Sequence, residues 1–293
     1  MITVFTPTYN RAYMLPKLYE SLLAQTCRDF EWLIVDDGST DETINVVKEL
    51  LIRNEVNIQY HYKENGGLNS AYNYAVTHTN NEIFFRVDSD DSIKKDAIQS
   101  IYDNWHFVEN DTRLCGLVFL SVFDDNKTVG FHPFEYDFET NFFDYRYKHH
   151  ATGDRAEVIK TEVLRQYLFP LFKDEKFVPE GLMWNRIANR YNCVYVNKPI
   201  YVRNYGGDSI TAKIVKILKR NNKGATLYYS ELLKHRQPIF FFFKHSLLYW
   251  RYAFYKKCNF AEKIKESGLT AFVVGFLPSL VLLALDKMKG RSI

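Results

Sequence analysis

Three aspartates fall within four consecutive positions at the end of an apolar segment, in the stretch FFRVDSDDS. Side chains alternate along an extended strand, so Asp88 and Asp90 project to the same side at its carboxyl end. Mg²⁺ and Mn²⁺ prefer carboxylate oxygens and commonly share their coordination shell with phosphates and water. The spacing therefore predicts a divalent-metal site at Asp88 and Asp90. In the alternative interpretation, this turn only caps a helix expected over residues 92–105.

Polar clusters also follow three other apolar or amphipathic segments. In EWLIVDDGSTDET, Asp36 and Asp37 end a strand, where a carboxylate can accept hydrogen bonds from a base N–H or from ribose hydroxyls. The stretch TPTYNR, residues 6–11, presents hydroxyl groups and an aromatic ring. Gly66 and Gly67 let the backbone approach a ligand at the start of a helix, where free amide groups favour anions. Together these clusters indicate a site for a nucleotide and its phosphates.

The first hundred residues alternate apolar runs with amphipathic stretches in the order βαβαβαβ. This order predicts an α/β fold with a mostly parallel central sheet and flanking helices, because parallel strands need a crossover between them. Right-handed crossovers place the carboxyl ends of such strands along one edge, where ligands bind in open sheets. All four polar clusters fall at that edge, so we expect them to form one crevice.

The alternation ends near residue 106. Helical patterns are predicted over residues 156–168 and 180–191, with a lid or acceptor side expected in this half of the chain. We therefore predict three regions, which are the nucleotide-binding half at 1–105, the acceptor-binding half at 106–215, and a helical extension at 216–293.

The C-terminal extension differs in charge and composition from the rest. Residues 201–293 carry 17 Lys and Arg against five Asp and Glu, while the net charge of the whole chain is +3. Basic and aromatic residues are interleaved over 239–257, and residues 268–285 carry no charge. Such sequences are typical of membrane interfaces. The apolar run is short for a spanning helix and contains Pro278, so we expect it to lie in, or insert shallowly into, an anionic membrane surface. The alternative is a buried helical hairpin.

Other features exclude several classes of protein. The basic charge is accompanied by no nucleic-acid-binding motif, so no nucleic-acid partner is expected. The four cysteines are far apart and form no CxxC pair, and no secretory signal pattern precedes them. Neither a zinc site nor a disulfide framework is therefore expected, and a reducing cytosol is the simplest compartment.

The stretches FTPTYNR, IVDDGSTDET, NGGLNSAYNYAV and FRVDSDD, in this order and spacing, resemble the successive signatures of family 2 glycosyltransferases with the GT-A fold. The resemblance covers roughly residues 2–100. It implies transfer of a sugar from a nucleotide diphosphate to a hydroxyl with inversion. By this resemblance Pro7, Tyr9 and Asp37 line the nucleobase and ribose, and Asp88 faces the ribose or sugar. Gly67 is also expected at the nucleotide site. Asp90, with Asp88, holds Mg²⁺ or Mn²⁺ on the diphosphate.

The second half of the chain resembles the family more loosely. Members usually carry a catalytic carboxylate, often in a Glu-Asp pair, at a helix start. Here Glu180 follows Pro179, but Gly181 stands in place of the second acid. We expect Glu180 to be the catalytic base, because inverting transfer needs a carboxylate near the acceptor hydroxyl. In the alternative interpretation, Glu180 has no catalytic role and its negative charge only stabilises the helix by lying near the positive end of the helix dipole.

The resulting hypothesis is an EC 2.4 enzyme with a UDP or dTDP sugar donor and a glycan or lipid-linked acceptor. We expect it at the cytoplasmic face of a bacterial cell membrane, in surface polysaccharide synthesis. Two alternatives stay open. The first is a sugar nucleotidyltransferase. A Gly-rich basic loop after the first strand would indicate such an enzyme, but this chain has TPTYNR there. A catalytically silent nucleotide-sugar-binding membrane scaffold would bind nucleotide without turnover.

Overall fold

The computed structural model describes residues 1–204 and 210–288. The chain forms two compact units. The first unit contains Met1–Leu168 and Arg186–Gly206, and the second contains Phe169–Asn185 and Gly207–Ile293. Each unit is described by itself below.

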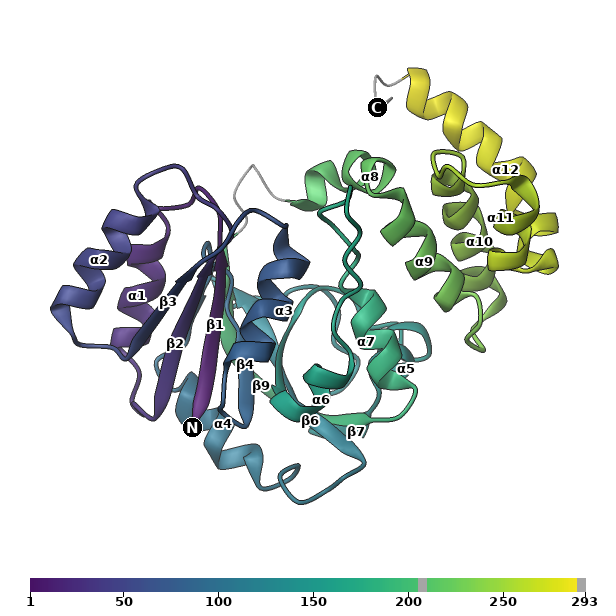
Figure 1. The fold of residues 1–293 in the computed structure, drawn as a ribbon. Helices are drawn as coiled ribbons and strands as arrows, with labels where there is room; N and C mark the ends of the chain where they lie inside the picture. Colours follow the sequence, from purple (N-terminus) through teal and green to yellow (C-terminus); the bar gives the residue numbers. More distant parts are fainter. Residues whose placement is uncertain (205–209, 289–293) are drawn as a thin grey trace. The chain divides into compact units, whose positions relative to one another are not determined.

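The first unit is built on a sheet whose N-terminal part is parallel. Its first strands are β1 (Ile2–Thr8), β2 (Phe30–Asp36), β3 (Ile58–Tyr62) and β4 (Ile83–Arg86). They lie in the order β3-β2-β1-β4, with every neighbouring pair parallel. The connecting helices are α1 (Leu15–Leu23), α2 (Thr43–Arg53) and α3 (Leu68–His78). Figure 1 shows α1 and α2 on one face of this sheet and α3 on the other. The predicted alternation is therefore confirmed.

The apolar pattern of the sequence accounts for this packing. Strand β2 is buried along its whole length, as expected for a strand covered on both faces. In α1, buried Leu15, Leu18 and Leu22 recur at helical spacing and pack into the main core with Trp32 of β2. Pro16 in the first turn of α1 suits the start of a helix, where its missing N–H is not needed.

Beyond β4 the sheet is mixed rather than parallel. It continues through β8 (Arg155–Lys160), β6 (Leu114–Phe123), β9 (Asn192–Arg203) and the two-residue β5 (Ser92–Ile93), with β7 (Phe138–Thr140) paired to β9. Strand β8 runs antiparallel to both β4 and β6, while β6 and β9 are parallel. The first unit also contains α4 (Ala97–Trp105), α5 (Phe142–Tyr147) and α6 (Thr161–Gln166). Helix α7 (Gly181–Ala188) begins in the segment Phe169–Asn185 of the second unit.

One predicted element is wrong over part of its length. The helix expected over residues 156–168 begins only at Thr161, and residues 156–160 belong to β8. Val158 and Ile159 are β-branched and fully or nearly buried between two strands, where they pack well. A short apolar run does not by itself distinguish a buried strand from a buried helix.

The second unit is helical over its C-terminal part. Its helices are α8 (Ile210–Arg220), α9 (Asn222–Leu232), α10 (Ile239–Ala253), α11 (Phe260–Ser267) and α12 (Leu269–Met288). Trp250 of α10 is buried and its ring lies 5.3 Å from that of Phe272 and 5.1 Å from that of Phe276, both on α12. Aromatic residues of the two long apolar runs therefore pack against each other to form the core of this unit.

Candidate active site

The turn after β4, residues 88–91, is held by arginine side chains from three segments. Arg86 donates to Asp88 with 2.7 Å between Nε and Oδ1, and Arg203 at the end of β9 reaches Asp88 at 3.4 Å. Arg11, from the turn after β1, pairs with Asp90 at 2.7 Å. Burial opposes the ionised form of Asp88, but the two guanidinium groups outweigh it, so the pKa of this carboxyl is lowered. The repulsion among these aspartates is thus relieved by cations of the chain itself.

Asp91 is the most deeply buried member of the turn, with 1% of its surface exposed. It accepts hydrogen bonds from the Tyr201 hydroxyl at 2.7 Å, the Asn204 backbone N–H at 2.8 Å and Arg203 at 3.1 Å. Burial raises the pKa of this carboxyl to about 6, against the opposing effect of Arg203. The expected helix over 92–105 in fact begins at Ala97, so this turn does not cap it. Asp91 instead ties the turn to β9.

Asp37 is also bound by its own chain. Its carboxylate accepts from the Gly66 and Gly67 backbone N–H groups at 3.0 and 2.7 Å, and Lys63 lies 2.6 Å away. Gly67 has φ +87°, a conformation that only glycine adopts readily. Gly38, with φ +85°, lies so close to Asn65 that an added Cβ would stand 2.8 Å from its backbone nitrogen. Asp37 therefore joins the turn after β2 to the start of α3.

The turns after β1 and β2 are joined as well. The Asp37 N–H donates to the Thr8 carbonyl at 2.9 Å, and Asn10 accepts from the Thr40 N–H and donates to Ser39. Pro7 lies in β1, and Tyr9, which directly follows this strand, has 49% of its surface exposed. Three of the predicted polar clusters are thus linked at one sheet edge. The fourth, after β4, is tied to the first by the ion pair between Arg11 and Asp90.

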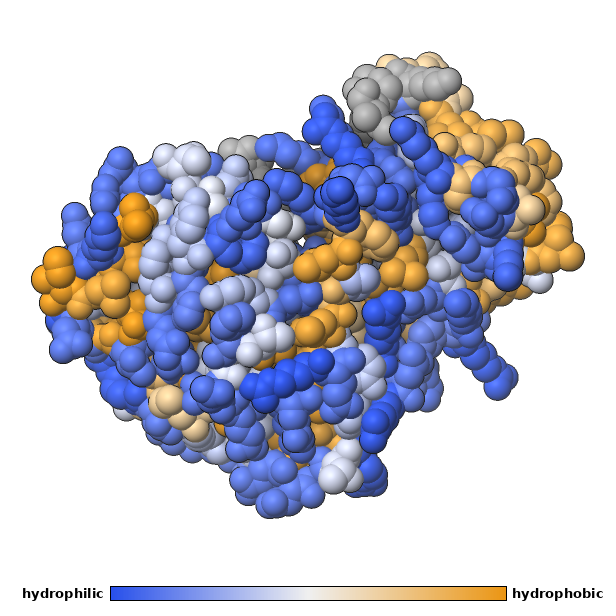
Figure 2. Space-filling view, in the orientation of Figure 1, coloured by the Kyte–Doolittle hydropathy of each residue, from blue (hydrophilic) through white to orange (hydrophobic). Residues whose placement is uncertain are grey.

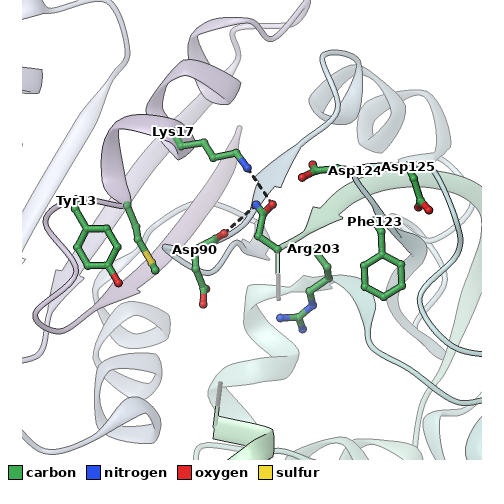
Figure 3. A pocket seen from close by; sticks show the side chains of 9 residues that line it. Tyr13, Lys17, Asp90, Phe123, Asp124, Asp125 and Arg203 are labelled. Carbon is green, nitrogen blue, oxygen red and sulfur yellow. Dashed lines mark hydrogen bonds between the residues drawn. The ribbon is translucent and has the colours of Figure 1, made fainter. Parts of the chain in front are cut away.

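A pocket of about 610 Å³ opens beside Asp90 within the first unit (Figure 3). Its described lining comprises Tyr13, Met14, Lys17, Asp90, Phe123, Asp124, Asp125, Arg203 and Asn204. Asn204 links two sides of it, because Lys17 donates to its side-chain oxygen at 2.9 Å and its amide group donates to the Asp90 carbonyl at 3.0 Å. Of the predicted site residues, Asp90 alone is among these lining residues.

Glu180 belongs to the second unit, directly before α7. Its carbonyl accepts from the Met183 N–H at 3.0 Å in the first turn. Its side chain is half-buried. At Gly181 an added Cβ would lie 2.9 Å from the ring and hydroxyl of Tyr228, also in this unit. The space that a side chain at position 181 would need is therefore taken by Tyr228.

Comparisons with known proteins decide the family. The sequence model described as Glycosyl transferase family 2 matches residues 3–170, more than half of the chain. This chain is a family 2 glycosyltransferase. A chondroitin synthase of Pasteurella multocida is 33% identical over 129 residues, or 44% of this chain. The glycosyltransferase GlyA of Streptococcus pneumoniae is 36% identical over 101 residues, or 34% of this chain. These matches span only 12% and 14% of the two relatives.

Solved structures confirm the GT-A fold of this glycosyltransferase. S. aureus TarS 1–349 in complex with UDP-GlcNAc has a TM-score of 0.64 at 20% identity, over 94% of this chain and 83% of that one. The mannosyltransferase PcManGT from Pyrobaculum calidifontis, in complex with GDP-Man and Mn²⁺, has a TM-score of 0.56 at 18% identity, over 99% of this chain and 80% of that one. At these identities the likeness concerns the fold.

The donor set of the Asp-rich turn fits a divalent cation. Asp88, Asp90 and Asp91 each bring a carboxylate oxygen within 4.8 Å of the others, and oxygen is the ligand that Mg²⁺ and Mn²⁺ prefer. The three differ in availability. Both oxygens of Asp88 and of Asp91 accept bonds from the chain, whereas the contact to Asp90 involves one oxygen and Arg11. Asp90 is therefore the best placed of the three to hold a metal.

The sequence interpretation missed the cations of this site. Lys63, Arg86 and Arg203 pair with Asp37, Asp88 and Asp91, and each comes from a different segment. The pairing of Arg86 with Asp88 could have been predicted, because side chains two residues apart on an extended segment lie on the same face. The pairing of Arg203 with Asp91 could not have been predicted from the sequence, because it depends on β9 entering the sheet beside β5.

Proposed function

We propose that this glycosyltransferase moves a sugar, with inversion, from a UDP or dTDP donor to a hydroxyl of a glycan or lipid-linked acceptor. Bacterial surface polysaccharide synthesis at the cytoplasmic face of the membrane is the proposed setting. The observation that carries the proposal is the set of hydrogen-bonded turns after β1, β2 and β4, which gathers Tyr9, Asp37 and Asp90 on one sheet edge. Relatives named for polysaccharide synthesis and neighbours bound to UDP-GlcNAc and GDP-Man support it.

In this proposal the first unit binds the donor. The exposed ring of Tyr9 and the residues around Pro7 contact the base, and Asp37 keeps the Gly66-Gly67 loop in place for the nucleotide. Asp88 accepts from the ribose or sugar hydroxyls. Mg²⁺ or Mn²⁺ on Asp90, with Asp88, would supply positive charge to the diphosphate. Arg11, whose guanidinium lies 2.7 Å from Asp90, would turn some of its hydrogen bonds from this carboxylate to the phosphates of the donor.

Glu180 is the proposed base. It would accept the proton of the acceptor hydroxyl while that oxygen attacks the anomeric carbon from the side opposite the leaving diphosphate. Gly181 leaves Glu180 as a single acid rather than half of a pair. If Glu180 is not the base, Asp154, paired with Arg203 at 2.9 Å, is the next candidate.

Two variants test the donor and the base separately. Asp90→Asn is expected to abolish the Mn²⁺ dependence of nucleotide binding, measured by titration calorimetry. The control Asp103→Asn, at an exposed residue of α4, is expected to keep it. Glu180→Gln is expected to lower turnover by roughly 10² to 10⁴ with donor affinity unchanged. Full activity of the unmodified enzyme in excess chelator would exclude the metal. Nucleotide binding with no turnover on any acceptor would instead favour a silent scaffold.

The membrane part of the proposal rests on how α12 is packed. Leu269–Asp286 is long and apolar enough to cross a membrane, with a mean hydropathy of 2.1, and 22% of this segment is buried. The exposed side chains form a stripe at helical spacing that contains Leu269, Val273, Leu277, Leu280, Val281, Leu285 and Met288. Figure 2 shows hydrophobic side chains gathered over this region. An exposed apolar face of this length is rare in a protein surrounded only by water.

On its inner side α12 packs small residues as well as Phe272 and Phe276 against α10. Ala271, Gly275 and Ser279 are buried at intervals of four, and an added Cβ at Gly275 would lie 2.6 Å from the backbone of Ser246 on α10. Small residues between helices with large apolar residues outside are the pattern of helices in lipid. Basic residues predominate over acidic ones from residue 201 onward, which favours an anionic surface.

Charged substitutions on the exposed stripe test this assignment without disturbing the core. Val273 and Leu277 are 66% and 67% exposed, so changing both to Glu is expected to leave the thermal melt intact but to release the protein from anionic vesicles. The matched control is Ile52→Glu, an 83% exposed residue on α2. Retention of the double variant on vesicles in high salt would show that the stripe is not the membrane contact.

A further inference from the structure

The segment around Glu180 lies along one face of α9, and both belong to the second unit. An added Cβ at Gly224 of this helix would stand 2.8 Å from the Phe177 carbonyl oxygen. About one turn further along α9, the Tyr228 ring would stand 2.9 Å from an added Cβ at Gly181. The chain on both sides of Glu180 is therefore in direct contact with α9.

Glu175 caps the start of α9 from outside the helix. Its two carboxylate oxygens accept from the backbone N–H groups of Lys223 and Gly224 at 2.7 and 2.9 Å. These N–H groups belong to the first turn, where they have no partner within the helix. The carboxylate also lies at the positive end of the helix dipole. Two charge-assisted hydrogen bonds thus hold the chain that leads to Glu180 on this helix.

Asn221 returns this contact from the helix to the segment. It directly precedes α9, but its side chain does not cap that helix. Its side-chain oxygen instead accepts from the Lys176 and Phe177 N–H groups at 2.9 and 3.1 Å. Its amide group donates to the Ile217 carbonyl of α8 at 2.8 Å, which fixes the direction of the side chain. Separating the two segments would break hydrogen bonds to backbone groups on both of them.

Helix α9 is itself packed into the helices of the C-terminal part (Figure 1). The ring of buried Tyr229 stacks on that of Tyr252 of α10, with 5.8 Å between the centroids. Helix α10 in turn packs against α12 through Trp250. A continuous set of contacts therefore joins the Glu180 segment to the helix that carries the exposed apolar stripe. The proposed donor residues all belong to the first unit.

We propose that Glu175 and Asn221 are positioning residues for Glu180, and that they fix the base to the same packed unit as the helices assigned to the membrane. The inference rests on the proposed function and adds the residues through which the helical unit supports the chemistry. Both residues act through the backbone of residues 176–180 and not by contact with substrate. Their loss should slow the chemical step with donor affinity unchanged, because displacing a catalytic group by about 1 Å can cost roughly 10²-fold in rate.

Hydrogen exchange of the full chain in detergent, followed by mass spectrometry, tests the contact with α9 without any substrate. Glu175→Ala is expected to speed exchange over residues 176–184 and 222–226 by roughly tenfold, as for the loss of one charge-assisted hydrogen bond, and to leave peptides containing Asp90 unchanged. Glu175→Gln keeps one acceptor oxygen and should give a smaller increase. Asp174→Ala is the matched control, because its carboxylate pairs with Lys223 but its side chain is 69% exposed. Exchange at the parent rate in Glu175→Ala would overturn the proposal.

Turnover tests whether this contact positions the base. Nucleotide release is followed from whichever of UDP-glucose, UDP-N-acetylglucosamine or dTDP-glucose the parent uses fastest, with water or a lipid extract of bacterial membranes as acceptor. Glu175→Ala is expected to lower kcat by roughly 10- to 100-fold at unchanged donor KM. In the Glu180→Gln background the same change should have little further effect, because Glu175 acts through Glu180.

The possible failures are distinguishable. Equal losses of kcat in both backgrounds would show that Glu175 only supports folding, which overturns the proposal while the base assignment stands. Normal turnover of Glu180→Gln alone would show that the proposed base is wrong, whatever the exchange result. No nucleotide release from any donor by the parent would refute the proposed function itself.

Discussion

Replacing Arg203 with Met tests whether the carboxylates of the site are supported by a cation. Arg203 contacts Asp91 at 3.1 Å, Asp88 at 3.4 Å and Asp154 at 2.9 Å. Met keeps a long flexible side chain and removes the charge. The loss should be felt mainly at Asp91, because that residue is 1% exposed while the side chain of Asp154 is 53% exposed.

The expected loss in the free energy of unfolding follows from the burial of these carboxylates. A hydrogen bond to a buried charge contributes about 1.5–3 kcal/mol, and removing one partner of a buried ion pair costs about 3–5 kcal/mol. Asp91 keeps its bonds from Tyr201 and Asn204, so the lower end applies. The Nε atom of Arg203 is itself buried without a hydrogen-bond partner in the described residues, and its removal returns about 1 kcal/mol. The net loss is about 2–3 kcal/mol, which corresponds to a fall in Tm of about 4–12 °C.

The assay is thermal unfolding followed by circular dichroism, with Arg113→Met as the matched control. Arg113 also pairs with an aspartate at 2.7 Å, but its side chain is 75% exposed, so its loss should lower the Tm much less than the loss of Arg203. Mn²⁺ should raise the Tm of the Arg203 variant more than that of the parent, because a bound cation replaces the missing charge. Equal Tm values for the two variants would refute the view that Arg203 stabilises this turn.

Two further predictions concern stability in each unit. Burial, reinforced by the Arg155 guanidinium, lowers the pKa of His132 to about 4. Since the unfolded value is about 6.5, this contribution to stability is complete above pH 6.5 and falls by about 1–2 kcal/mol as the pH drops toward 4, after discounting for partial exposure. Burial also lowers the pKa of His245 to about 4, so in urea unfolding His132→Gln should lose less stability than the parent over this pH range while keeping part of the loss. In the second unit, Gly181→Asp should cost about 1–3 kcal/mol because its Cβ meets Tyr228, and adding Tyr228→Ala should recover part of that loss in a double-mutant cycle; additive effects would show that the two positions are not in contact.

The sequence predicted the parallel half of the fold well because the signals there are local. Strand and helix periods alternate cleanly through residue 86, and Gly38 and Gly67 adopt the positive φ values that tight turns require. The mixed half was predicted less well. Strand β8 is short and is followed directly by α6, so the sequence pattern does not show where the strand ends and the helix begins. Its antiparallel pairing with β4 depends on the rest of the sheet. Pairing between distant segments leaves no periodic trace in a single sequence.

The same distinction explains which parts of the site were foreseen. Acidic residues at strand ends were visible, because like charges at close spacing are costly and call for an explanation. Their partners were not, because Lys63, Arg11 and Arg203 reach them from other strands and turns. The arginines change the chemical meaning of the cluster. A metal at Asp90 enters a turn that is already close to neutral, so it competes with Arg11 rather than filling a purely negative site. Donor diphosphate brings the charge that both the metal and Arg11 can share, and for this reason we expect metal and nucleotide to bind with positive coupling, each tighter in the presence of the other.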